Sequence, residues 1–367
     1  MPPLPKEPKG RFRGSVAPSG GGPGIPSPGG AFQHTVSIAF VRGAVQRLDK
    51  AARAAVLQRA AIAPELLAAD AARVPAAAFA ALWLAVGEAL DDEFFGLDSR
   101  RMKVGSFALL CHSLMAQGTV ERALRQALRG FALFLDDIGV TLSVDGAHAL
   151  LAIDNRIDAA DARRFADETL LVMVHGLLCW LAGRRVPLSR LDWGHPRPPH
   201  ADEYRRMFST RLSFDHGATL ACFDARVLRA ATAVTPAALQ VFLRQAPQSV
   251  FLKQVHEGGG RGGWAERVRR HLRRDVLQPA AEPLTLDVLA RQLALSPATL
   301  RRRLDDEGAG WQALKDEVRR DLAINRLADP GLSIEHVAAQ LGFNDASSFH
   351  RAFRRWTGAA PGAYRSG

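Results

Sequence analysis

The chain has 367 residues, of which 47% are apolar, and a net charge of +11. This length and composition exclude a wholly disordered chain and are enough for two or three domains with hydrophobic cores. The three cysteines are odd in number and have no C-x-x-C spacing, which argues against a disulfide framework or a cysteine zinc site. Arginine outnumbers lysine 42 to 6, a skew that suggests a GC-rich genome, so the arrangement of the basic residues must decide whether they bind nucleic acid.

The first 30 residues are dense in proline and glycine and lack the apolar region of a signal peptide. We expect a disordered tail over residues 1–35 and a cytoplasmic protein. The longest apolar run, residues 170–183, contains a histidine and is too short to cross a membrane. It predicts a core helix, with no membrane as partner.

Residues 40–135 show the three- and four-residue apolar spacing of helices. Residues 141–154 are two alternating runs joined by Asp145-Gly146, which predicts a β-hairpin. A long helix is expected over 161–183. Short strands are expected at 189–195, 211–216 and 218–224. These elements predict an α+β domain over residues 40–250.

A glycine-rich linker is expected at 255–263, and residues 264–367 show only helical patterns. This last part contains an internal repeat, because residues 284–296 match residues 332–344 when shifted by 48. The matched pairs are Leu284 and Leu332, Leu286 and Ile334, Leu289 and Val337, Ala290 and Ala338, Gln292 and Gln340, and Leu293 and Leu341. Two short helices joined by a tight turn, twice over, predict tandem helix-turn-helix units joined by a helix over 311–329.

The second helix of each unit has an apolar side and a polar side. In the later one, Phe349, Phe353 and Trp356 fall within about 40° of one another at 100° per residue, a narrow stripe facing a small core. The second helix of a helix-turn-helix enters the major groove of DNA, where arginine can bind guanine, serine and histidine several base edges, and alanine the thymine methyl group. By position, Arg303, Arg354 and Arg355 suit phosphates. The alternative for any one of these side chains is an ordinary solvated surface residue.

Residues 284–365 resemble the DNA-binding domain of the AraC/XylS family of bacterial transcription regulators. The resemblance rests on a C-terminal pattern of eight positions: Gly342, Phe343, Phe349, Phe353, Gly358, Pro361, Tyr364 and Arg365. One departure is Ala294 in the first turn, where that family often has glycine, and we expect a tolerated turn. The resemblance implies two recognition helices that read successive major-groove faces of double-stranded DNA. The base-facing residues it implies are Ala298, Arg301, Arg302, Ser347, Ser348, His350 and Arg351, and Thr299 completes the DNA-binding candidates.

The region over 45–250 is similar to the arabinose-binding-like effector domain of an AraC subgroup, on the stretches that include His195, Pro196, Pro198 and Glu203–Phe208. This resemblance implies a small-molecule effector of unknown identity and a homodimer, without implying a sugar. An activator that contacts RNA polymerase is the function the family implies. The candidate effector-binding residues are Trp83, Phe107, His112, Phe134, His175 and Trp180, each of which could equally be an ordinary core residue.

Other classes of function have less support. His195 and His200 lack a third ligand at metal spacing, so no metal is expected. The acidic run Asp91, Asp92, Glu93 is expected to be a solvated helix end, and no nucleophile or phosphate-loop motif occurs, so no catalytic residue and no cofactor are predicted. Two alternatives stay open: a ligand-independent DNA-binding protein controlled by partner proteins, and an enzyme fused to a DNA-binding domain.

Overall fold

The computed structural model describes residues 34–209, 211–246, 263–278 and 284–365. The expected tail over 1–33 and the expected linker up to residue 262 lie outside the described residues. The folded part begins slightly earlier than the expected tail boundary at 35, because Thr35 already lies in a strand. The described residues form two separate hydrophobic cores, one built mainly from residues before 247 and one from residues after 263.

The N-terminal part opens with a small antiparallel pair of strands, β1 (Thr35–Ser37) and β2 (Arg73–Pro75). The helices expected over residues 40–135 are present. They are α1 (Ile38–Val45), α2 (Lys50–Arg59), the 3-10 helix η1 (Pro64–Ala68), α3 (Ala76–Leu90), α4 (Ser106–Ser113) and α5 (Val120–Phe134). The sequence interpretation missed β2, because a three-residue strand that pairs with a distant segment leaves no local periodicity.

A five-stranded sheet follows, in the order β3-β4-β7-β5-β6. Its strands are β3 (Ile138–Asp145), β4 (His148–Asn155), β5 (Leu188–Asp192), β6 (Leu212–Ser213) and β7 (Thr219–Asp224). All neighbours pair antiparallel except β5 and β6, which are parallel. The predicted hairpin is confirmed, since Asp145 pairs with His148 and Gly146 adopts φ +54° in the turn.

The helix α6 (Ala160–Leu181) is the central core element of this part and contacts both α5 and β4. Every residue from Leu170 to Leu181 is buried, which confirms the expected core helix. The remaining elements are α7 (Asp202–Met207), the 3-10 helix η2 (Ala225–Arg229) and α8 (Pro236–Gln245). Among the described residues, none of the helices combines the length and apolar character needed to cross a bilayer.

The expected solvated acidic helix end after α3 is wrong in one respect. Asp92 is only 3% exposed and accepts hydrogen bonds from the backbone N–H groups of Phe94, Gly96 and Met102. Its neighbour Glu93 accepts from the backbone of the next loop. These carboxylates therefore organise a turn, a role that depends on backbone geometry absent from the sequence pattern.

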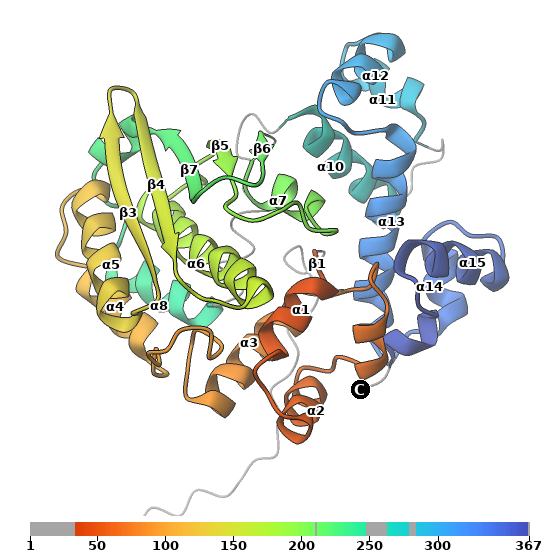
Figure 1. Ribbon diagram of the computed structural model, residues 1–367. Helices are drawn as coiled ribbons and strands as arrows, with labels where there is room; N and C mark the ends of the chain where they lie inside the picture. Colours follow the sequence, from red (N-terminus) through yellow and green to blue (C-terminus); the bar gives the residue numbers. More distant parts are fainter. Residues whose placement is uncertain (1–33, 210, 247–262, 279–283, 366–367) are drawn as a thin grey trace, which may run out of the picture. The chain divides into compact units, whose positions relative to one another are not determined.

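The C-terminal part is entirely helical within its described residues (Figure 1). Its elements are α10 (Trp264–Leu277), α11 (Leu286–Gln292), α12 (Pro297–Asp305), α13 (Trp311–Leu327), α14 (Ile334–Gln340), α15 (Ala346–Thr357) and the 3-10 helix η3 (Pro361–Tyr364). Figure 1 shows α13 running between the α11–α12 pair and the α14–α15 pair. The apolar positions expected to face the core on α13 are buried: Leu314, Val318, Leu322 and Leu327.

Candidate nucleic-acid interface

The first helix-turn-helix unit, α11 and α12, is defined by two hydroxyl caps and one turn. The side chain of Thr285 accepts a hydrogen bond from the backbone N–H of Val288, and that of Ser296 accepts from Thr299 at 3.1 Å. Each bond satisfies an otherwise unpaired N–H of the first helical turn. Between the helices Ala294 adopts φ +55°, so the turn forms without the glycine that is frequent there.

The second unit, α14 and α15, repeats this construction. Ser333 accepts from the backbone N–H of His336, and Asp345 accepts from that of Ser348 at 2.7 Å. Gly342 occupies the turn at φ +77°, and Gly358 ends α15 at φ +72°. Hydrogen bonds from Ser348 lower the pKa of the Asp345 carboxyl, so this cap is ionised at neutral pH.

The apolar side of each second helix points into the C-terminal core. Leu300 and Leu304 of α12 are at most 1% exposed, and Phe349 and Phe353 of α15 are fully buried. Phe349 packs edge-on to Phe343 with ring centroids 5.4 Å apart. These contacts fix the rotation of both helices, so their polar sides necessarily face outward.

On the outer side of α12, Ala298, Arg301 and Arg302 are exposed. Neither arginine forms an ion pair with any residue of the described part. Thr299 is half-buried, and its hydroxyl lies 2.8 Å from that of Ser296. Both arginines are therefore available to a partner, whereas Thr299 already serves the helix start.

Arg303 is placed differently from its two neighbours. Its guanidinium lies over the ring of Trp264, with 4.2 Å between the guanidinium carbon and the ring centroid. Arg267 lies over the same ring at 4.1 Å. The first turn of α10 is also held to the end of this unit, since the backbone N–H of Trp264 donates to Glu307 at 2.6 Å. Arg303 thus has a packing role besides any contact with phosphate.

The outer side of α15 carries most of the remaining candidates. The exposed ones are Ser347, His350, Arg351, Arg354 and Arg355. Ser348 is half-buried and donates its hydroxyl to Asp345, while Arg351 donates to the Ser348 oxygen at 3.0 Å. Arg355 lies 3.7 Å from the carboxylate of Asp316. The structure therefore brings the α15 candidates together on one solvent-facing surface, with Ser348 and Arg351 already ordered against the cap.

The candidate effector residues do not converge on one place. Phe107 and Trp180 meet through Phe242, whose ring centroid lies 6.2 Å and 4.6 Å from theirs. Trp83 is buried against Phe95 at 4.6 Å, and His175 is fully buried beside Val186 and Cys179. Phe134 is half-buried and His112 is exposed. Phe242 escaped the sequence interpretation because nothing in its local pattern marks it as the residue between these two rings.

No group of metal-ligating side chains occurs among the residues that the structure describes. The three thiols are free, with Cys111 and Cys179 buried and Cys222 half-buried. The charged residues that sequence reasoning missed altogether are Arg73, Glu203 and Asp321, which form a buried cluster with members from both parts of the chain. Their separations along the chain are too long for any motif to reveal.

Comparison with known proteins agrees with this geometry. The sequence matches the family model of the arabinose-binding N-terminal domain of AraC transcription regulators over residues 51–231, and a helix-turn-helix domain over 289–367. The ornithine utilization regulator of Pseudomonas aeruginosa is 28% identical over 315 residues, which cover 85% of this chain and 90% of that one. The regulator VqsM of the same organism is 30% identical over 210 residues, covering 56% of this chain and 61% of that one. The crystal structure of its regulator CdpR is 30% identical and covers 71% of this chain and 82% of that chain, with a TM-score of 0.28.

Paired helix-turn-helix units behind a ligand-binding domain define a DNA-binding transcription regulator. The chain belongs to the AraC family of transcription regulators.

Proposed function

We propose that this protein is a sequence-specific transcription activator of the cytoplasm, controlled by a small-molecule effector that binds the N-terminal domain. The observation that carries the proposal is the pair of capped helices α12 and α15, whose apolar sides are buried and whose arginine-bearing sides are exposed. Exposed guanidinium groups at the start of such helices suit the acceptor atoms of guanine in the major groove.

The geometry supports a division of labour among the candidates. Arg301, Arg302 and Arg351, with Ala298, Ser347 and His350, lie on exposed helix surface and read base edges in this proposal. Arg354 and Arg355 lie further along α15 and contact phosphates. Ser348 and Thr299 act mainly by holding the two helix starts through their own hydrogen bonds.

The effector and the partners follow from the family. The proposed effector contacts are the N-terminal candidates Phe107, Trp180, Trp83, Phe134, His175 and His112, with Phe242 added by the structure between Phe107 and Trp180. A homodimer that presents its DNA-binding parts to paired half-sites, and that contacts RNA polymerase, completes the proposal. Effector binding shifts the population of dimers or of domain arrangements, and so changes which half-sites are occupied together.

Two measurements test this function. Full-length protein is mixed with random double-stranded oligonucleotides at low ionic strength, and the bound fraction is sequenced after several rounds. Enrichment of one motif supports the proposal, and recovery of an unchanged pool contradicts sequence-specific binding. A thermal-shift screen of small metabolites, with L-ornithine among them because one relative's name mentions it, then looks for stabilisation without turnover.

A further inference from the structure

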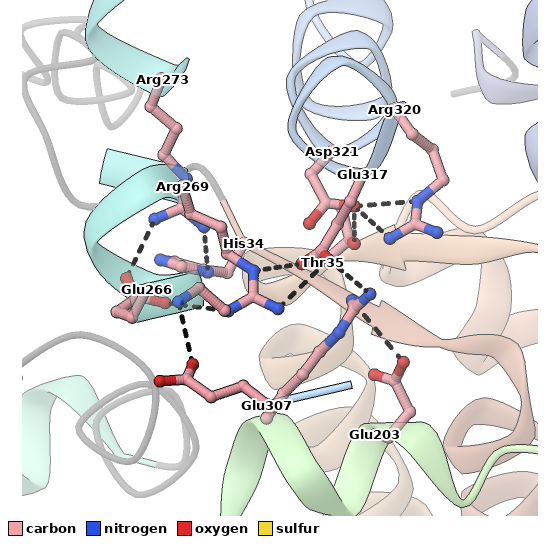
Figure 2. A network of polar contacts seen from close by, with 12 residues as sticks. His34, Thr35, Glu203, Glu266, Arg269, Arg273, Glu307, Glu317, Arg320 and Asp321 are labelled. Carbon is pink, nitrogen blue, oxygen red and sulfur yellow. Dashed lines mark hydrogen bonds and ion pairs between the residues drawn. The ribbon is translucent and has the colours of Figure 1, made fainter. Parts of the chain in front are cut away.

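A cluster of charged side chains is buried where β1, β2 and α7 meet α13 (Figure 2). Arg73 of β2 is 6% exposed, Glu203 of α7 is 8% exposed and Asp321 of α13 is 4% exposed. Charged residues are almost never buried to this degree unless they are paired. The cluster is notable because α13 belongs to the C-terminal core, whereas β1, β2 and α7 belong to the N-terminal part.

Arg73 is the central residue of this cluster. Its guanidinium donates to the Glu203 carboxylate at 2.8 Å and to the Thr35 hydroxyl at 2.6 Å. The Thr35 hydroxyl in turn donates to Asp321 at 2.8 Å, and the Arg73 guanidinium lies 3.8 Å from the same carboxylate. One buried positive charge is thus shared between a carboxylate of the N-terminal part and a carboxylate of α13.

A second set of ion pairs surrounds this centre. Arg206 of α7 lies 3.1 Å from Glu317, one turn before Asp321 on α13. Glu317 also accepts a hydrogen bond from Arg269 of α10 at 3.0 Å. Arg320 donates to Asp321 at 2.9 Å. The N-terminal part therefore holds one side of α13 at two successive turns, by directional bonds between charged groups.

The chemistry of these contacts suits a joint that opens and closes. Removing one partner of a buried ion pair leaves an uncompensated charge and is strongly destabilising. When all partners separate together, however, water solvates every charge, and no large apolar surface becomes exposed. A charged joint can therefore have two discrete states, closed or hydrated, with little populated between them.

The helix held in this way is the one that joins the two helix-turn-helix units. Leu314 and Val318 near its start and Leu322 and Leu327 towards its end are all buried in the C-terminal core. The recognition sides of α12 and α15 stay exposed while the cluster is formed. Holding α13 thus orients both units without covering either one.

We propose that Arg73, Glu203, Asp321 and the surrounding ion pairs form a latch, through which the N-terminal domain grips α13 and passes its own state to both helix-turn-helix units. This inference rests on the proposed function, because it names the route by which an effector changes DNA binding. The latch also works in reverse, since DNA bound by α12 and α15 changes the stability of β1 and β2.

Hydrogen exchange of the full-length chain tests the latch directly. The variant Asp321→Asn keeps the size of the side chain and removes its charge. The matched control is Asp316→Asn on the same helix, since Asp316 pairs with Gln312 and Arg355 within the C-terminal part. We expect Asp321→Asn to raise amide exchange in residues 35–37 and 73–75 on the order of tenfold, and Asp316→Asn to leave it unchanged. If Asp321→Asn does not fold, Glu317→Gln in the outer set replaces it.

The second arm adds duplex DNA selected by the wild-type chain from a random pool. We expect DNA to alter exchange at residues 73–75 in wild type and in Asp316→Asn, but not in Asp321→Asn, although all three bind the duplex at low ionic strength. Unchanged exchange in DNA-free Asp321→Asn, or an undiminished response to bound DNA in that variant, overturns the latch alone. A wild-type chain that selects no duplex overturns the proposed function and the transmission with it, while the DNA-free comparison still decides whether the contacts hold α13.

Discussion

Ala294 and Gly342 occupy corresponding positions in the turns of the two helix-turn-helix units, and both have left-handed backbones, with φ +55° and φ +77°. In each turn the backbone must reverse between two short helices, and a left-handed residue makes this reversal. Glycine adopts such a conformation freely, whereas the Cβ atom of alanine lies too close to the neighbouring carbonyl oxygen. The first unit therefore carries a strain that the second one lacks.

Exchanging these two residue types should have opposite effects on stability. Ala294 is exposed, so Ala294→Gly loses little packing and should raise the free energy of unfolding by about 1 kcal/mol. Gly342→Ala should lower it by about 1 kcal/mol, because an added Cβ would have ordinary contact distance to Arg319 and only the backbone would be strained. Chemical denaturation of the full-length variants measures both. A stabilised Gly342→Ala would show that the turn does not need a left-handed residue.

The exposed arginines should divide into base-reading and phosphate-binding residues. Arg302→Ala and Arg351→Ala should each cost about 1–3 kcal/mol of binding free energy and relax the preference at one base pair. Arg354→Ala should weaken binding to all sequences alike and reduce the salt dependence. Binding measured on the selected duplex and on single-base variants separates the two patterns. An equal loss on every sequence would assign Arg302 and Arg351 to phosphates instead.

Arg303 should behave unlike Arg302 although the two are adjacent. Because Arg303 lies over the ring of Trp264, Arg303→Ala should lower the free energy of unfolding by about 0.5–1 kcal/mol. Arg302→Ala, which removes an exposed side chain, should leave stability nearly unchanged and reduce DNA binding. Trp264→Leu provides the matching test of the ring. A stable Arg303→Ala protein with impaired DNA binding would assign this residue to the DNA surface alone.

The features that the sequence predicts are those whose causes are local. Thr285, Ser296, Ser333 and Asp345 cap helices through hydrogen bonds that span only three residues, so the residue pattern alone indicates both the caps and the repeat. The Asp145-Gly146 turn is predictable for the same reason. Each of these signals lies within a few residues of the turn or helix end that it produces.

Features made by distant residues cannot be predicted in this way. The strand β2 exists because it pairs with β1, and Arg73 is buried because Glu203 and Asp321 neutralise it. The position of Arg303 on its helix suggests a phosphate contact, yet Trp264 of another helix lies against it. Side-chain partners brought together only by folding leave no periodic trace, and these include the residues of the proposed latch.

The stability of the whole chain should depend on pH through Glu203. Burial alone would raise the pKa of this carboxyl, but the charges of Arg73 and Arg206 and the hydrogen bonds from Arg73 lower it to about 2. Its ordinary value is 4.5, so the unfolded chain takes up this proton at a higher pH than the folded one. The stabilisation from Glu203 is therefore complete above about pH 4.5 and is lost as the pH falls towards 2.

The variant Glu203→Gln isolates this contribution, because other acids titrate in both chains and their effects cancel. At neutral pH Glu203→Gln should lower the free energy of unfolding by about 3–5 kcal/mol, since Arg73 keeps its charge but loses its main partner. Between pH 4.5 and pH 2 the gap between wild type and variant should shrink by roughly 3 kcal/mol, as the wild-type carboxyl is protonated. Urea denaturation at a series of pH values measures the gap. A gap that stays constant over this range would mean that Glu203 has the same pKa in the folded and unfolded chains, and that Arg73 does not hold its charge.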